Sequence, residues 1–224
     1  RIQKFTTAIV VMWTIFFLIS LGWNLLSLFA NLKLLAKHKA KQFLQKDIIY
    51  RQWNIKLGGV YAKIGENLKP NPDLKFEKKN ITTLEGEKLT YITPTYMTRQ
   101  IYELTNKAGG IMGKISSIKP INSADKPDKW EKKAFDKFKK GKKEYSSIVK
   151  IRGVYYTRFI KPIYIKPNCI NCHKEKNYKK GDIKGGISVL VPMQPYWEIF
   201  YHKSLYLTIG HTFLWVIGLT GIFL

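Results

Sequence analysis

Two long runs without a single charged residue lie near the ends of this 224-residue chain. The first covers residues 5–32 and the second covers residues 205–224, and both are rich in large apolar side chains. About 20 apolar residues in a helix cross the hydrocarbon core of a bilayer. A cleaved signal peptide is the alternative for the first run, but its apolar core normally has only about 7–15 residues. The two runs therefore predict transmembrane helices over residues 1–32 and 205–224.

The segment between the runs predicts a mixed domain. Residues 33–54 contain no Gly or Pro and mix Lys with apolar residues, which predicts that the first helix continues outward as a juxtamembrane helix. Gly58 and Gly59 are its stop signal. Beyond them we predict a loop over 60–73, a hairpin over 81–93, helices over 95–106 and 130–140, and strands over 111–121, 145–149, 153–165 and 186–191. Helices between antiparallel strands make an α+β domain, which we place over residues 55–204.

The motif Cys169-Ile170-Asn171-Cys172-His173 is typical of covalent haem attachment. Each thiol can add to one haem vinyl group, and His173 then stands under the iron as its proximal ligand. A zinc site needs four ligands, and a second Cys or His pair at zinc-ligand spacing is missing from the sequence. A redox-active dithiol normally lacks the adjacent His, and a coincidence of residues is the remaining alternative. The motif predicts one c-type haem, held by Cys169, Cys172 and His173.

This haem also predicts how the chain is placed in the membrane. Resemblance to c-type cytochromes implies attachment on the outer side of the cytoplasmic membrane. The middle segment is then periplasmic, or on the equivalent outer face, and nucleic acid is excluded as a partner. That segment carries 37 of the 39 basic residues and all 15 acidic residues, an excess of 22 positive charges. Such an excess attracts acidic proteins or anionic lipid headgroups, although a merely solvated lysine-rich surface has the same composition.

Two polar residues interrupt the apolar runs. Asn24 lies eight residues and His211 six residues from the outer end of its predicted span. Because buried polar groups in a membrane seek partners, we expect them to form a hydrogen bond across the helix pair. A b-type haem on His211 is the alternative, but the first run offers no second His.

Several motifs of the middle segment resemble one family closely. They are RQWNIKLGGVY (51–61), NITTLEGEKLTYITPTYMTRQIYEL (80–104), ISSIKPINSADKPDKWE (115–131), CINCH and YKKGDIKGGISVLVPM (178–193). They resemble the single-haem c-type domain with a PAS-like fold, long filed as a domain of unknown function. That domain occurs in free periplasmic proteins and in the sensory parts of membrane kinases. The resemblance implies a PAS-like antiparallel sheet with flanking helices and one c-type haem. Leu57 departs from the family, in which His often precedes the Gly-Gly pair.

The resemblance also points to the second axial ligand. In shorter relatives a Cys on the helix before the segment matching residues 115–130 ligates the iron, and Met97 stands at that place here. A Met/His pair raises the reduction potential and favours electron transfer over gas binding. The alternative for Met97 is ordinary core packing, which is the usual role of a single methionine. Its rivals are His38, His202, Met112 and Met193.

Basic residues near these positions are candidates for the haem propionates. Arg99 lies two residues after Met97 and matches the family motif. Arg152 and Arg158 flank an aromatic strand, where we expect surface arginines on a sheet.

Two functions fit these features. The first is a membrane-anchored mono-haem cytochrome that transfers electrons, as a single protein or as a subunit of a larger membrane complex. The alternative is the haem-based redox or gas sensor ectodomain of a transmembrane receptor. We expect no enzymatic activity, because the sequence shows no pair of catalytic carboxylates, no Ser-His-Asp set and no phosphate-binding glycine loop.

Overall fold

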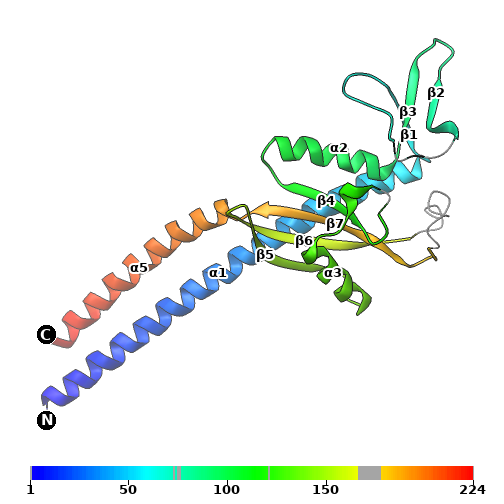
Figure 1. Ribbon diagram of the computed structural model, residues 1–224. Helices are drawn as coiled ribbons and strands as arrows, with labels where there is room; N and C mark the ends of the chain where they lie inside the picture. Colours follow the sequence, from blue (N-terminus) through cyan, green and yellow to red (C-terminus); the bar gives the residue numbers. More distant parts are fainter. Residues whose placement is uncertain (1, 73, 75–76, 121, 166–177, 224) are drawn as a thin grey trace. The chain divides into compact units, whose positions relative to one another are not determined.

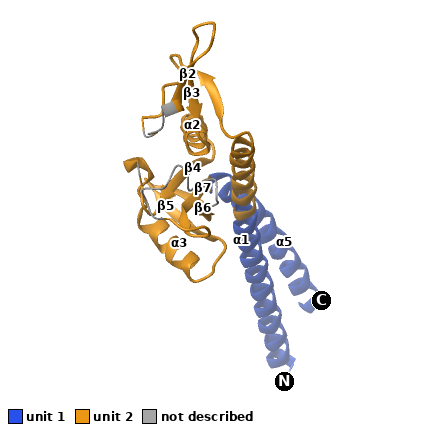
Figure 2. Cartoon of the chain, turned by 90° about the vertical axis from the view of Figure 1, so that its right-hand side faces the viewer, with its two compact units in different colours: residues 1–36, 193–224 blue, residues 37–192 orange. Residues whose placement is uncertain are grey.

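The computed structural model describes residues 2–72, 74, 77–120, 122–165 and 178–223. The chain forms two compact units: residues 37–192, and residues 1–36 together with 193–224 (Figure 2). Helix α1 (Ile2–Lys56) is continuous across both units: its residues up to 36 belong to the smaller unit, and those from 37 onward belong to the larger unit. The predicted transmembrane segment 1–32 and juxtamembrane segment 33–54 are thus parts of one helix.

Residues 1–36 and 193–224 form a pair of helices. The second helix is α5 (Gln194–Phe223), which begins before the predicted run at residue 205. Aromatic side chains join the two: Phe29 stacks on Trp197 with ring centroids 5.6 Å apart, and the Trp215 indole N–H donates to Thr14 Oγ1 at 3.1 Å. Both helices are long and apolar enough to cross a membrane.

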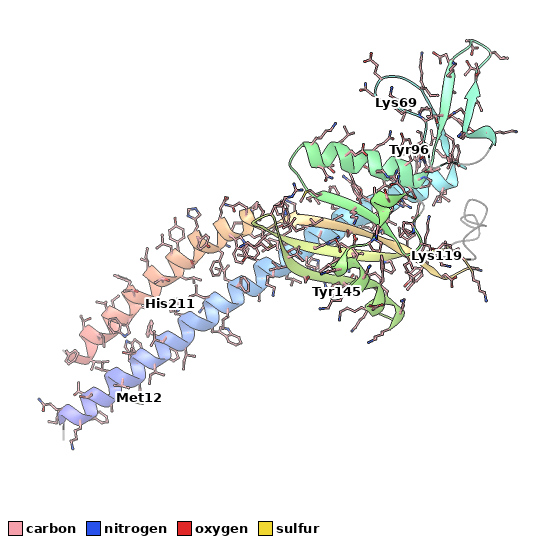
Figure 3. The ribbon with its side chains drawn as sticks, in the orientation of Figure 1. Met12, Lys69, Tyr96, Lys119, Tyr145 and His211 are labelled. Atoms are coloured by element: carbon pink, nitrogen blue, oxygen red, sulfur yellow. The ribbon has the colours of Figure 1, made fainter. Side chains whose placement is uncertain are left out.

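The expected hydrogen bond between Asn24 and His211 is wrong. Asn24 Nδ2 donates to the Ser20 carbonyl at 2.8 Å, one turn back in its own helix. His211 pairs with the other helix through Ser20 Oγ, 3.2 Å from its Nε2 (Figure 3). Its Nδ1 lies 2.8 Å from the Leu207 carbonyl, which can only accept, so Nδ1 carries the proton. Both ring nitrogens of His211 therefore have protein partners.

A four-stranded antiparallel sheet forms the middle of the larger unit (Figure 1). Its strands, in the order β4-β7-β6-β5, are β4 (Met112–Ser117), β7 (Ile183–Pro192), β6 (Val154–Tyr164) and β5 (Tyr145–Ile151). Successive side chains of a strand point to opposite faces. The pairings Phe159↔Val189 and Gly113↔Val189 put these three residues on one face. Their neighbours Lys114, Arg158 and Ser188 lie on the other face.

Helix α3 (Lys129–Lys139) covers the face of Arg158 and Ser188. Its first turn is closed by a capping box, in which Asp128 and Glu131 each accept from the other's backbone N–H. The helix predicted over residues 130–140 is confirmed, and its Ala134, Phe135 and Phe138 are buried against Ile160. Arg158 is not the surface arginine that we expected, because its side chain lies under α3 and is 5% exposed.

Helix α2 (Pro94–Lys107) and the outer part of α1 lie on the opposite face (Figures 1 and 2). Thr93 caps the N-terminus of α2, and Pro94 is its first residue. The N–H that proline lacks would have no partner within the helix at this position, so no hydrogen bond is lost. Tyr102 of α2 packs over Gly113, where an added Cβ would collide with the phenol ring. The outer part of α1 buries one face through residues spaced three or four apart: Ala40, Leu44, Asp47 and Asn54.

A second, smaller antiparallel sheet follows α1, so the domain has two sheets where we expected one. Its order is β1-β3-β2, from β1 (Val60–Lys63), β2 (Asn80–Thr82, after the short 3₁₀ helix η1, Glu77–Lys79) and β3 (Lys88–Ile92). The hairpin of β2 and β3 is confirmed, but the loop predicted over 60–73 is partly wrong. Val60–Lys63 forms a strand because it pairs with β3. This pairing cannot be predicted from the residues next to Val60–Lys63 in the sequence.

Candidate functional site

In the sequence, the Cys169–His173 motif falls between β6 and β7, the two central strands of the larger sheet. Cys169, Cys172 and His173 themselves lie outside the described residues. The described residues on either side are joined, because the Ile165 N–H donates to the Asp182 carbonyl at 2.9 Å and the Gly181 N–H donates to the Ile165 carbonyl at 3.0 Å. The connection that carries the motif therefore leaves and re-enters the sheet at the same end.

Tight backbone packing marks this end of the sheet. Gly185 of β7 lies opposite Ser117 of β4, and an added Cβ on Gly185 would collide with the Ser116 carbonyl. Tyr178 packs here under the ammonium group of Lys119, which lies 5.2 Å from its ring centroid. Burial raises the pKa of the Tyr178 phenol, so this hydroxyl stays protonated at neutral pH. Figure 3 labels Lys119.

Met97 lies on α2, whose first turn points to this same end. The chain passes through α2, turns, and returns along β4, which ends at Ser117. Tyr102 lies over Gly113, near the start of β4, so the start of α2 lies toward the other end of that strand. Arg99 supports this direction, because it reaches Asp125 in the short 3₁₀ helix η2 (Ser123–Asp125) that follows β4. The half-buried Met97 and the two ends of the motif's connection thus belong to the same end of the sheet.

Two neighbouring segments hold the first turn of α2 in place. Arg51 Nη1 of α1 donates to the Pro94 carbonyl at 3.0 Å and to Thr98 Oγ1 at 3.1 Å. The Tyr96 hydroxyl donates to the Lys69 carbonyl at 2.7 Å, and Figure 3 labels both residues. The backbone around Met97 is therefore fixed by polar contacts before any cofactor is considered.

Arg99 is already engaged in an ion pair. Its Nη2 lies 3.2 Å from Asp125 Oδ2, and both side chains are largely buried. A propionate would have to share this guanidinium with Asp125. The geometry assigns Arg99 first to joining α2 and η2.

The four rivals of Met97 lie elsewhere. Met112 pairs with Leu190 at the opposite end of β4, five residues and roughly 17 Å from Ser117. Met193 follows the end of β7 at that same far end and is fully buried. His38 is exposed on α1, and His202 belongs to the helix-pair unit.

Sequence reasoning missed two clusters of buried polar side chains in the described part of this domain. Under α3, Glu131 is fully buried and accepts from Arg158 Nη2 (2.9 Å), Lys114 Nζ (3.1 Å) and Ser188 Oγ (3.0 Å). On the opposite face, the Tyr102 hydroxyl donates to Asp47 Oδ2 at 2.7 Å. The capping-box pattern around Glu131 was visible in the sequence, but its burial depends on the sheet that α3 covers.

Opposing influences set the pKa values of the acids in these two groups. Burial raises the pKa of Asp47, and the Tyr102 hydrogen bond and the charges of Lys46 and Arg51 only partly offset this. For Asp128 burial also raises the pKa, but the Glu131 backbone N–H and the Arg158 guanidinium lower it below its usual value.

The family model of the Tll0287-like proteins matches residues 30–192 of this chain. The chain belongs to the Tll0287-like family. The matched residues include the whole of the larger unit together with residues 30–36 of α1, and they contain the Cys169–His173 motif. Among solved structures, the crystal structure of the cyanobacterial heme-protein Tll0287 is similar to the chain with a TM-score of 0.37 and 15% identity, over 45% of this chain and 72% of that chain. None of the curated proteins matches the chain.

Proposed function

We propose that this Tll0287-like protein is a membrane-anchored cytochrome with one covalently attached c-type haem. The observation that carries the proposal is the Cys-x-x-Cys-His motif at Cys169–His173 inside the matched family range. The family's namesake is called a heme-protein in its title, which supports the same cofactor. The two cysteines would hold the haem by thioether bonds, and His173 would be its proximal ligand.

Met97 is our proposed second axial ligand. Two observations support this proposal. The start of α2 lies at the end of the sheet where the connection carrying the motif begins and ends, and the contacts of Arg51 and Tyr96 fix the first turn of α2. A thioether ligand opposite His raises the reduction potential and leaves no position for an external gas. Met97 and His173 would hold the iron, and the Arg99–Asp125 ion pair positions the helix that carries Met97.

The covalent haem is tested on the purified full-length protein. We expect the polypeptide mass to increase by one haem, and the haem to remain in the protein band after denaturing electrophoresis. The Cys169→Ser/Cys172→Ser variant should lose both signals while its helix content stays measurable by circular dichroism. A protein that binds haem only reversibly, or binds zinc in its place, would refute the c-type assignment.

Met97 is tested by optical spectroscopy and potentiometry. Met97→Ala should remove the sulfur-to-iron charge-transfer band of the oxidised protein and lower the reduction potential. Met112→Ala is the matched control, because Met112 lies at the opposite end of β4 and should leave both unchanged. A Met97→Ala protein that keeps the band would show that another side chain completes the coordination.

Electron transfer on the outer face of the cytoplasmic membrane is the role that we propose for this haem. The two candidate spanning helices, α1 and α5, support a membrane anchor with the haem domain in the periplasm or its equivalent. Exposed lysines on α3 support an acidic redox protein as partner, since opposite charges speed encounter. We propose neither an enzymatic activity nor nucleic acid as a partner. The test is copurification with a respiratory or photosynthetic complex under mild solubilisation.

A redox or gas sensor is the second candidate, and the contacts between α1 and α2 favour it. Arg51 and Asp47 of α1 bond directly to Thr98 and Tyr102 of α2, the helix that carries Met97. A ligand change at the iron would shift α2, and α1 continues as one helix toward the membrane. The PAS-like fold implied by the resemblance fits such a receptor and stays a prediction. A signalling domain encoded after residue 224, with no copurifying redox complex, would favour sensing.

A further inference from the structure

A basic pocket lies at the edge of the larger sheet, next to α1. Strand β5 begins at Tyr145, opposite Ile160, so the last residues of β6 extend beyond it without a partner on that side. The segment between α3 and β5 lies beside this free edge. The resulting lysine pocket has a volume of about 440 Å³ and is lined by Lys41, Lys143, Glu144, Lys161, Pro162 and Tyr164. This volume falls within the range of roughly 300–1,000 Å³ typical of small-ligand sites.

Positive charge dominates the lysine pocket. Three ammonium groups line it, and Glu144 is the acidic residue among the lining residues. Glu144 accepts from Lys37 Nζ at 3.1 Å and from Lys41 Nζ at 3.2 Å. Burial raises the pKa of Glu144, but these two lysines lower it further, so it is ionised at neutral pH. One carboxylate facing three lysines leaves an excess of two positive charges, which a monoanionic phosphodiester complements.

The lysines of α1 lie where such a phosphodiester is abundant. The apolar run of α1 ends at Leu32, and Lys37 and Lys41 follow five and nine residues later in the same helix. At 1.5 Å per residue, their Cα atoms lie about 8 and 14 Å beyond the apolar run. The polar layer of a bilayer extends roughly 5–8 Å beyond each side of the hydrocarbon core. Helical side chains also tilt toward the helix N-terminus, which is the membrane side of α1, and long lysines reach further in that direction.

We propose that the lysine pocket binds the headgroup of an anionic phospholipid, with Lys41, Lys143 and Lys161 contacting the phosphodiester. The inference rests on the membrane anchor proposed above and is independent of the haem. A bound headgroup would join α1, β6 and the segment before β5, and so fix the haem domain on its first helix.

The experiment measures lipid binding to the full-length protein in detergent by native mass spectrometry. Phosphatidylglycerol and phosphatidylcholine with the same acyl chains are added in turn, because they differ in net charge. We expect at least a tenfold preference for phosphatidylglycerol, since a lysine near an anionic surface contributes roughly a fivefold gain. Lys41→Gln/Lys143→Gln/Lys161→Gln should lower phosphatidylglycerol binding about tenfold or more. The corresponding triple Arg variant keeps the charges and should retain the preference, which separates loss of the site from loss of the fold.

The matched control removes the same charge from α3. Lys129→Gln/Lys132→Gln/Lys133→Gln alters exposed lysines outside the pocket and should keep the preference. Equal losses in the two Gln variants, or equal binding of both lipids by the unaltered protein, would overturn the proposal. Displacement of phosphatidylglycerol by inorganic phosphate at equal concentration would overturn the lipid assignment and leave a free-phosphate site. Extraction of the chain from membranes by alkaline carbonate would refute the proposed membrane anchor itself. A chain that stays in the membrane but shows no preference for phosphatidylglycerol would refute this inference alone.

Discussion

The two faces of the four-stranded sheet differ in how they are held to their helices. Under α3, Arg158 is 5% exposed and Glu131 is fully buried, and their ion pair is extended by Asp128, Lys114 and Ser188. On the opposite face, Phe159 and Val189 are fully buried, and the polar contacts between α1 and α2 are hydrogen bonds such as the one from the Tyr102 hydroxyl to Asp47.

This difference follows from the cost of burying charge. Removing one partner of a buried ion pair leaves a charge that neither water nor a counter-charge compensates, so the contacts of Glu131 and Arg158 tie α3 strongly to the sheet. The Arg158 guanidinium also lies 4.5 Å from the Trp130 ring centroid, so its flat surface is covered as well. The opposite face gains stability from apolar burial, which is not directional. We infer that α3 is held to the sheet mainly by buried charges, whereas α1 and α2 are held mainly by apolar burial together with hydrogen bonds.

The largest effect is expected from breaking the ion pair under α3. Glu131→Ala removes the fully buried carboxylate that pairs with Arg158 and Lys114, so that only the partly exposed Asp128 still pairs with the Arg158 guanidinium. We expect a loss of about 3–5 kcal/mol in the free energy of unfolding. Thermal unfolding of the full-length protein in detergent, followed by circular dichroism, measures it. Asp136→Ala is the matched control, since Asp136 lies on the exposed side of the same helix and pairs only at the surface with Lys139. Similar losses in both variants would show that burial is not what makes Glu131 important.

A smaller effect is expected on the opposite face. Tyr102→Phe removes the hydroxyl that satisfies Asp47, and an unsatisfied buried acceptor costs about 1–3 kcal/mol. The same unfolding measurement checks this value at neutral pH. A loss as large as that of Glu131→Ala would contradict the difference between the two faces.

The pH dependence of the stability loss in Tyr102→Phe provides a second check on the hydrogen bond between Tyr102 and Asp47. Burial raises the pKa of Asp47 in the folded state above its unfolded value of 3.8, so folding is favoured by protonation as the pH falls toward that value. Without the Tyr102 hydroxyl, which lowers this pKa, the folded carboxyl would titrate at higher pH. The deficit of Tyr102→Phe should therefore shrink between neutral pH and about pH 4. A deficit that stays constant would show that Asp47 does not titrate in the folded protein.

The smallest effect is expected at the partly exposed ion pairs of α1. Glu144→Gln removes the pairs with Lys37 and Lys41, and such pairs contribute about 0–1 kcal/mol. Raising the salt concentration should abolish even this difference, because salt screens exposed charges. A large loss that persists in high salt would place this contact with the buried ion pairs under α3.

Local sequence signals were sufficient to predict the elements whose boundaries depend on neighbouring residues. Thr93-Pro94 marks the start of α2, and Asp128 with Glu131 marks the start of α3, because capping is settled by residues within one turn. The hairpin of β2 and β3 follows from the turn at Gly86, whose φ of 84° suits glycine. Strand β1 was missed because its identity depends on pairing with β3, about thirty residues later.

The features of the candidate site also separate into those that consecutive residues determine and those that tertiary packing determines. The sequence alone determined the two apolar runs and the haem-attachment motif, because hydrophobic length and ligand spacing are properties of consecutive residues. Only the tertiary structure decided that Arg158 is buried, that Arg99 is joined to Asp125, and that His211 pairs with Ser20 instead of Asn24. Each of these contacts joins residues from different elements, and which side chains meet across elements is set by packing. The spacing along one strand or one helix does not contain that information.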